Sequence, residues 1–287
     1  MAKEEKPKTD FTEENQDFPR VGKQAFAKGE NVRDRGSLKE GGRGKSDARD
    51  FGINIDEMAR AGVQFGHQTF RIHPKMKPYL SGMRNGIHII DLEKTAEKLR
   101  EALIFVEDFI SQGKVLLLVG TKVQFKDLVK NVAKEYDLPY VSERWLGGTF
   151  TNFDTMKKRI GYFKDLEKKK KEGGLEKYTK KERAKIDEEL KEYEVKFGGI
   201  KNMEKLPEAI FVLNMKKDEI AVKEAKMKNV KVVGISHTNT NPDLADYPIP
   251  ANDDARSSVQ YILEKVKEAI LSAKQKTENK KQETEKK

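Results

Sequence analysis

Three short apolar runs constrain the fold of this chain more than any other feature. Val115–Val119, Ala209–Leu213 and Val230–Ile235 are apolar at almost every position, without the alternation of a half-exposed strand. Such runs are typical of parallel sheets that are covered on both faces. Because segments with helical apolar spacing separate them, we expect a doubly wound α/β fold with a mainly parallel sheet, similar to flavodoxin or Rossmann domains.

Shorter signals complete this domain. Asn54 and Gly62 stand where a short helix would have its N-cap and its end. Ile87–Ile90 and Pro139–Val141 are predicted to be strands. Asp91 should cap a long helix, and its buried stripe is predicted to be Leu92, Ala96, Leu99, Leu103, Val106 and Ile110. Further helices are expected around residues 125–136, 220–227 and 259–270.

Residues 152–198 have a different character, because lysine and glutamate surround their apolar positions. These positions are Met156, Ile160, Phe163 and Leu166, then Ile186, Leu190, Tyr193 and Phe197, all at helical spacing. Gly173 and Gly174 break the first helix, and Thr179 with Glu182 can form the capping box of the second. The pattern predicts an antiparallel helical hairpin, a coiled coil, inserted into the α/β domain.

The stretch Arg144–Asn152 joins these two parts. Trp145 is the only tryptophan, and we expect its indole to pack between the hairpin and the α/β domain. Gly147 and Gly148 are expected to set the direction of the hairpin, since glycine adopts backbone conformations closed to other residues. Thr151 or Asn152 can cap the next helix, although an ordinary turn would explain much of this stretch.

Both ends of the chain are poor in the apolar residues that a core requires. Residues 1–52 are expected to be a disordered extension and residues 273–287 a disordered tail, because neither can offset the entropy of ordering. The α/β domain is then expected over 53–151 and 199–272, with the hairpin at 152–198.

Charge and composition narrow the kinds of partner. The chain has a formal net charge of +10, which favours a polyanion. It has no cysteine, so disulfides, thiolate metal sites and thiol catalysis are excluded. No apolar run approaches the roughly 20 residues that span a bilayer, and we expect a cytoplasmic protein without a membrane partner.

An enzyme with this fold would place its site at the carboxyl ends of the parallel strands. The polar candidates there are Thr121, Lys122, Asn214, Ser236 and His237. The chain lacks a P-loop, and no Gly-x-Gly-x-x-Gly motif follows a predicted strand, so nucleotide binding has weak support. No local spacing supports an ion held by His67, His237 and Asp253. We therefore expect no catalytic residue, no cofactor and no metal.

Several motifs give the chain a resemblance to a known family. They are Gly62–Thr69, Pro74–Tyr79, Arg84–Leu92, Arg144–Gly148, Thr151–Phe153, Gly198–Lys201, Asp246–Pro250 and Asn252–Ala255. Through them, residues from about Asn54 to Ile270 resemble the bacterial form of the second protein of the small ribosomal subunit. The chain departs from that family at Ile72 and His73, where a Trp-Asn pair is usual. It departs again at His237, where aspartate is common, so no ion site is carried over from the family.

The resemblance implies a structural protein that binds 16S rRNA near the junction of head and body, contacts neighbouring small-subunit proteins and supports translation. It implies no catalysis and no small-molecule substrate. The family motifs, the basic hairpin and the loops after Phe65 together indicate which residues are expected to bind RNA. These are His67, Lys75, Lys77, Arg84, Asn85, Arg144, Asn152, Lys157, Lys158, Arg159, Lys168, Lys169, Lys170 and Lys171.

The block of four lysines from Lys168 to Lys171 supports this expectation, because like charges on one helical turn repel unless anions offset them. Three alternatives stay open on the sequence alone. The basic residues can form a solvated surface, or the hairpin can be an adaptor that binds proteins. The chain can also be an α/β enzyme that binds a nucleotide or sugar phosphate at the carboxyl ends of its strands.

Overall fold

The computed structural model describes residue 49, residues 51–173 and residues 178–285. Most of the predicted N-terminal extension lies outside these residues. Within them, Phe51 is buried and Arg49 pairs with Glu107 and Asp108. Residues with a defined place in the fold therefore begin a little before the predicted boundary at residue 53.

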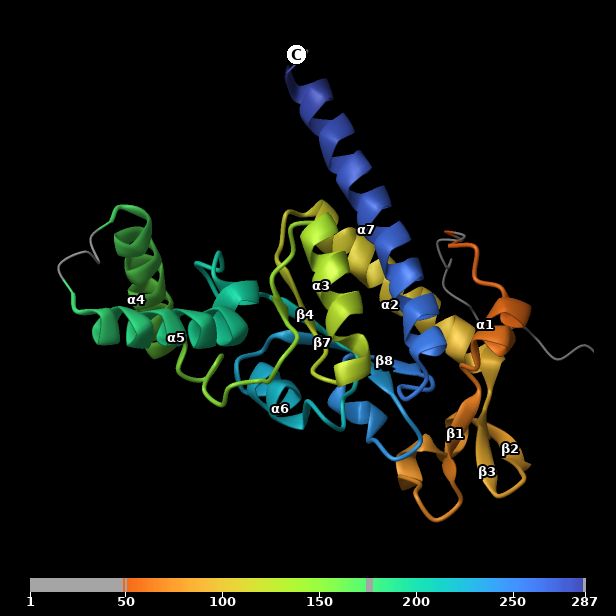
Figure 1. The fold of residues 1–287 in the computed structure, drawn as a ribbon. Coiled ribbons are helices and arrows are strands. Elements are labelled where there is room, and N and C mark those ends of the chain that lie inside the picture. The colour runs from red at the N-terminus through yellow and green to blue at the C-terminus, as the bar shows by residue number, and fades with distance from the viewer. Residues whose placement is uncertain (1–48, 50, 174–177, 286–287) are drawn as a thin grey trace, which may run out of the picture. The chain divides into compact units, whose positions relative to one another are not determined.

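A five-stranded parallel sheet forms the centre of the described chain (Figure 1). Its strands, in spatial order, are β5 (Tyr140–Val141), β4 (Leu116–Val119), β6 (Ala209–Val212), β7 (Lys231–Ser236) and β8 (Tyr247–Pro250). Every neighbouring pair is parallel. The three apolar runs form the three central strands, as the sequence predicts.

Both faces of this sheet are buried, because successive residues of a strand point to opposite sides. Leu116, Leu118 and Phe211 join one apolar cluster. The helices that contribute to it include α2 (Leu92–Ser111), α3 (Lys126–Glu135) and α7 (Arg256–Glu285). Leu117 and Ile210 join a second cluster. Its helices are α4 (Phe153–Lys171), α5 (Lys180–Phe197) and α6 (Glu219–Met227). The predicted α/β architecture is confirmed (Figure 1).

A second sheet, antiparallel and three-stranded, precedes the main sheet in the chain. Its strands are β1 (Phe65–Gln68), β3 (Ile87–Ile90) and β2 (Leu80–Arg84), in that spatial order, and a 3-10 helix spans Pro74–Tyr79. Of these elements the sequence predicts only β3, whereas β1 and the 3-10 helix lie where loops were expected. The reason is that β1 and β2 are short, mostly exposed strands with no apolar run.

The short first helix, α1 (Ile55–Ala61), begins and ends at the residues that the sequence predicts. The Asn54 side chain accepts the Asp56 N–H, and Gly62 ends the helix with a φ of 77°. Asp91 caps α2 by accepting the N–H groups of Glu93 and Lys94. These predictions are confirmed because each depends only on neighbouring residues.

Two elements differ from the sequence-based expectation. The strand β8 contains Pro248 and Pro250, which lack the N–H of other residues, and it forms because it lies at the edge of the sheet. The helix α7 continues to Glu285, through residues where a disordered tail was expected after position 272. Lysine, glutamate and glutamine are good helix formers, so a helix nucleated by the buried residues up to Ala273 propagates through them.

The helices α4 and α5 occupy the segment in which the hairpin is expected. The rings of Phe163 and Tyr193 lie 6.0 Å apart, and Lys170 donates to Asp187 at 2.7 Å. The predicted capping box at the start of α5 is present, with Thr179 and Glu182 bonded to each other's backbone. The apolar positions Met156, Ile160, Phe163, Leu166, Leu190 and Phe197 are buried, as predicted. The two helices therefore contact each other through the apolar positions that the sequence indicates.

Candidate nucleic-acid interface

The turn that leads into α4 is held by a carboxylate that sequence analysis did not identify. Glu224, on α6, is only 6% exposed. Its oxygens accept the backbone N–H groups of Gly148 at 2.7 Å, Phe150 at 2.9 Å and Thr151 at 3.2 Å. The indole N–H of Trp145 lies 3.4 Å from the same carboxylate. One side chain thus ties this turn to α6.

Burial by itself raises the pKa of Glu224, but the hydrogen bonds from Phe150, Gly148 and Thr151 outweigh it and lower the pKa. The group is therefore a carboxylate at neutral pH and accepts every one of these bonds. A signal was present in the sequence, since Glu224 lies between Ala221 and Ala225 on the buried face of its helix. An acid in an apolar stripe needs buried hydrogen-bond donors.

The predicted junction residues take up different roles. Trp145 is 5% exposed, packs edge-on against Phe150 and lies in the apolar cluster that joins α4 to the sheet. Gly148 has a φ of 91°, which favours glycine, whereas a Cβ atom added at Gly147 would meet nothing within 4 Å. Only Gly148 is required to be glycine on these grounds.

The expected side-chain cap of α4 is wrong. Asn152 occupies the N-cap position, but its side chain makes no capping hydrogen bond. The Thr151 hydroxyl lies 3.3 Å from the Glu224 carboxylate. The buried carboxylate therefore takes the group that would otherwise have capped the helix.

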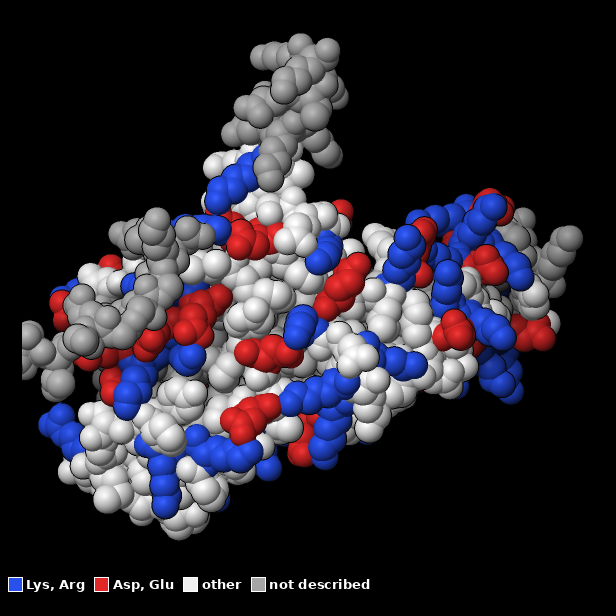
Figure 2. Space-filling view, turned by 180° about the vertical axis from the view of Figure 1, so that it is seen from behind, with Lys and Arg blue, Asp and Glu red and all other residues white. Residues whose placement is uncertain are grey.

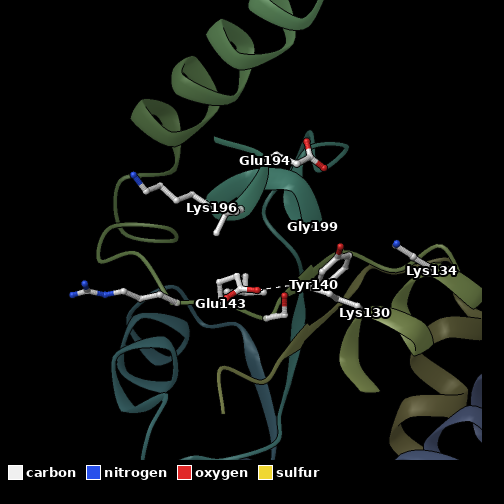
Figure 3. Close-up of a pocket in the computed structure, with 11 residues that line it drawn as sticks. Lys130, Lys134, Tyr140, Glu143, Glu194, Lys196 and Gly199 are labelled. Carbon is white, nitrogen blue, oxygen red and sulfur yellow. Dashed lines mark hydrogen bonds and ion pairs between the residues drawn. The ribbon is translucent and has the colours of Figure 1, made fainter. Parts of the chain in front are cut away.

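A charged cleft of about 240 Å³ opens beside this junction, between α3, β5 and the end of α5 (Figure 3). Its charged lining residues are Lys130, Lys134, Glu143, Arg144, Glu194 and Lys196. Glu143 is neutralised by Lys130, at 2.9 Å, and by Lys126. Lys134 and Arg144 are exposed, and neither has a hydrogen-bond or ion-pair partner among the residues that the structure describes. Two unpaired cations thus face one cleft, an arrangement that suits phosphate groups.

Sequence analysis selected Arg144 but missed the lysines of α3. Lys126, Lys130 and Lys134 recur at steps of four, which places them on one face of that helix. This spacing was the available signal.

The predicted RNA-binding residues of α4 are all exposed. They are Asn152 at its start, then Lys157, Lys158 and Arg159, and finally Lys168, Lys169, Lys170 and Lys171. Figure 2 shows basic side chains over this part of the molecule, with acidic ones among them. The last four lysines lie in the final turn of the helix, where the helix dipole favours cations, and Lys170 pairs with Asp187. Their crowding is therefore partly offset within the protein itself.

The other predicted residues belong to the region of the antiparallel sheet. Arg84 and Asn85 are exposed at the turn between β2 and β3, and Lys77 is exposed on the 3-10 helix. Lys75 forms an ion pair with Asp243. His67 differs from these four, because its side chain is only 16% exposed and contacts His237.

The polar groups at the carboxyl ends of the strands bind one another. The Thr121 hydroxyl donates to Asp218 at 2.7 Å, and Lys217 donates to the Thr121 carbonyl at 3.0 Å. Lys122 donates to Asp254 at 2.7 Å and to the Asp253 carbonyl at 2.7 Å. The residues that a nucleotide or sugar phosphate would need are thus engaged in holding loops together.

In the part of the chain that the structure describes, the helices are too short or too polar to cross a bilayer.

Comparison with known proteins points to the same family as the motifs do. Residues 58–273 match the family model of ribosomal protein S2. The chain is 43% identical over 223 residues to the small ribosomal subunit protein uS2 of Coprothermobacter proteolyticus, and the alignment covers 78% of this chain and 83% of that protein. The matched segment includes the main sheet, α4, α5 and the Glu224 contacts. The chain therefore belongs to the ribosomal protein S2 family, a family of structural proteins rather than enzymes.

Proposed function

We propose that this protein is a structural constituent of the small ribosomal subunit, which binds 16S rRNA near the junction of head and body and supports translation in the cytoplasm. The observation that carries the proposal is its 43% identity, over most of both chains, to a protein of the small subunit. Neighbouring small-subunit proteins are its other expected contacts. Its net charge of +10 suits the phosphates of RNA.

We also propose that α4 and α5 form an antiparallel, coiled-coil hairpin inserted into the α/β domain between β5 and β6. Phe163 contacts Tyr193, and Lys170, further along α4, pairs with Asp187, nearer the start of α5. This order supports helices that run in opposite directions. The hairpin would present the exposed lysines of α4 to rRNA from a base that Glu224 holds in place.

The RNA-binding surface is proposed to comprise the charged cleft and the basic residues of α4, together with the exposed side chains of the antiparallel sheet region. Lys134 joins the residues expected from the sequence, because it lines the same cleft as Arg144 and is unpaired within the described residues. His67 is left out of this surface, since its ring contacts His237. The remaining members are Lys75, Lys77, Arg84, Asn85, Asn152, Lys157, Lys158, Arg159, Lys168, Lys169, Lys170 and Lys171.

Binding of a 16S rRNA fragment at a series of salt concentrations tests the cleft. A plot of the logarithm of the binding constant against the logarithm of the salt concentration has a negative slope. Replacing both Lys134 and Arg144 with alanine should reduce the size of this slope by roughly 0.7–0.9 for each phosphate contact that is lost. The matched control replaces Lys98 and Lys223, which are already paired with glutamates on their own helices. If both double variants have the same slope as the wild type, the cleft does not bind phosphates.

The alternative is an α/β enzyme that binds a nucleotide or sugar phosphate at the strand ends, where Thr121 and His237 are buried and bonded to other groups of the protein. It predicts turnover of a nucleotide or sugar phosphate and no sedimentation with small subunits. An adaptor predicts that the α4 and α5 segment captures a protein partner after nuclease treatment. Sedimentation with small subunits, lost when rRNA is digested, would favour the ribosomal function over both.

A further inference from the structure

Two tight turns lie side by side at one end of the antiparallel sheet (Figure 1). The first, Gln68–Arg71, is closed by a hydrogen bond of 2.9 Å from its last backbone N–H to its first carbonyl. The second joins β2 to β3 through Asn85 and Gly86, whose φ angles of 51° and 73° suit a two-residue hairpin turn. The Thr69 N–H donates to the Gly86 carbonyl at 3.1 Å, and the buried His88 ring donates to the Thr69 carbonyl at 3.2 Å. These hydrogen bonds join the turns, residues 68–71 and 84–87, into one structure, which we call the tip.

The tip carries a phenylalanine that takes no part in the core. Phe70 is 73% exposed, and the Arg71 guanidinium lies 5.4 Å from the centre of its ring, within the range of a cation–π contact. Single exposed apolar residues are common on protein surfaces, so exposure alone indicates nothing. Here a second large apolar side chain, Met83, is also exposed on β2, directly before the second turn. The tip thus presents an aromatic ring that the described residues leave largely uncovered.

The chain around the tip lacks acidic residues. Residues 65–90 contain no aspartate or glutamate, although these make up 48 of the 287 residues of the chain. The same segment contains four cations, which are Arg71, Lys75, Lys77 and Arg84. Of these four, only Lys75 has an ion-pair partner among the residues that the structure describes, namely Asp243. A surface that lacks acids and leaves its cations unpaired is complementary to a polyanion, whereas a typical protein surface offers both signs of charge.

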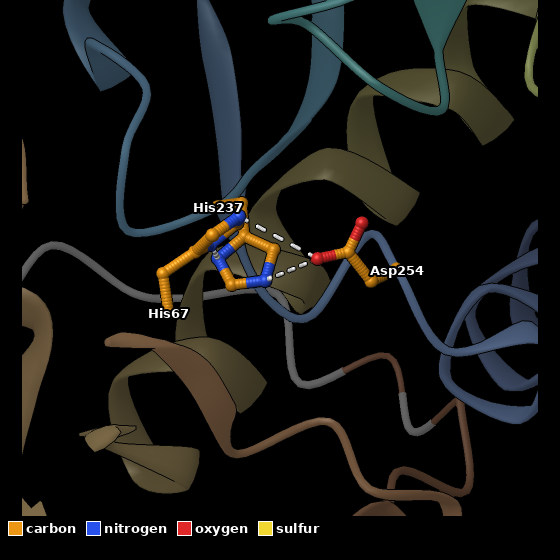
Figure 4. A group of neighbouring side chains, drawn as sticks. All are labelled: His67, His237 and Asp254. Carbon is orange, nitrogen blue, oxygen red and sulfur yellow. Dashed lines mark hydrogen bonds and ion pairs between the residues drawn. The ribbon is translucent and has the colours of Figure 1, made fainter. Parts of the chain in front are cut away.

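The first turn of the tip is anchored on both sides. His67, directly before it, donates its backbone N–H to the Thr238 hydroxyl at 3.0 Å. The His67 ring is turned away from the tip, since its Nδ1 lies 2.9 Å from Nδ1 of His237 (Figure 4). His73, just after the turn, donates its backbone N–H to the Thr238 carbonyl at 2.8 Å. Because the backbone around Phe70 is fixed before binding, a flat ligand can stack on the ring at a low entropic cost.

We propose that Phe70 is a stacking platform for an unpaired base of 16S rRNA, and that Arg71 and Arg84 bind phosphates next to that base. An unpaired base offers a flat face to an aromatic ring, and the phosphates of its strand supply the negative charge that this segment lacks. Arg71 serves both groups, since its guanidinium lies over the ring and keeps its N–H donors for a phosphate. The inference rests on the proposed function and deepens it, because it names a single-stranded nucleotide as the part of the rRNA that the tip binds.

Binding of the full-length protein to small ribosomal subunits that lack it, measured at a series of salt concentrations, tests the proposal. Phe70→Ala should weaken binding by roughly 5–150-fold, the contribution of one stacked base, and Phe70→Tyr should restore it. Both variants keep the wild-type charge, so the dependence of binding on salt should not change, whereas Arg84→Ala should make this dependence weaker. The matched control is Met227→Ala, which shortens an apolar side chain that is 71% exposed outside the tip. This control should bind as the wild type does.

Two further measurements separate the outcomes. Since the Phe70 ring is exposed, Phe70→Ala should melt at the wild-type temperature, which shows that weaker binding is not a loss of fold. With the photoreactive analogue benzoylphenylalanine in place of Phe70, illumination of assembled subunits should attach the protein to a nucleotide of 16S rRNA. The platform is overturned if Phe70→Ala binds as tightly as Met227→Ala, or if the analogue attaches to a ribosomal protein instead of rRNA. Failure of the wild type itself to bind the subunits would refute the proposed ribosomal function, on which the platform depends.

Discussion

Replacing Glu224 with alanine tests how strongly this carboxylate holds the turn that leads into α4. The change removes the acceptor of three backbone N–H groups, of which that of Phe150 is fully buried. The N–H groups of Gly148 and Thr151 are partly open to solvent, so water can replace some of the hydrogen bonding that they lose with the carboxylate. A buried donor left without a partner costs about 1–3 kcal/mol. The two buried donors, the Phe150 N–H and the Trp145 indole N–H, give an expected loss of roughly 2–6 kcal/mol in the free energy of unfolding.

This loss is large compared with the roughly 5–15 kcal/mol that stabilises a typical domain. Urea unfolding followed by circular dichroism measures it directly. The matched control is Glu219→Ala, which removes a half-exposed glutamate of the same helix that pairs with Lys223. It should change stability by less than about 0.5 kcal/mol. If the Glu224 variant unfolds at the same urea concentration as this control, the carboxylate does not hold the turn.

Two further predictions concern the same junction, and a third concerns Glu107 on α2. Trp145→Ala should cost roughly 3–5 kcal/mol, because the indole is buried, and should reduce incorporation into small subunits; a wild-type melting temperature would show that the indole is peripheral. Gly148→Val should destabilise the protein by about 1–3 kcal/mol, because valine rarely adopts the φ of 91° found at Gly148. It should impair incorporation into small subunits more than it lowers helix content. Gly147→Val, at a position with open space around it, should leave the melting temperature nearly unchanged. Burial alone would raise the pKa of Glu107, but its three hydrogen-bond donors lower it to about 2. The resulting stability is present above the unfolded pKa of about 4.3 and is lost as pH falls towards 2, so the urea midpoint of the wild type should drop more between pH 5 and pH 3 than that of Glu107→Gln.

The sequence by itself determined the elements whose signals are local. The runs at β4, β6 and β7 are apolar throughout because both faces of these strands are covered, and that need is visible in the strands themselves. The caps at Asp91 and Thr179 are equally local, since each acts on residues two or three places away. The family resemblance was also available from the motifs and is confirmed by the comparisons.

Only the tertiary structure decided which polar groups meet. Glu224 binds backbone groups more than 70 residues away, and His67 meets a histidine 170 residues further along the chain. No periodicity records such pairs, because they depend on which loops the strand order of the sheet brings to one place. The strand order also allowed proline in β8, whose position at the edge was not predictable from its own residues. Local pattern thus determines the central strands and the helix caps of this protein, whereas long-range packing selects the partners of its buried charges.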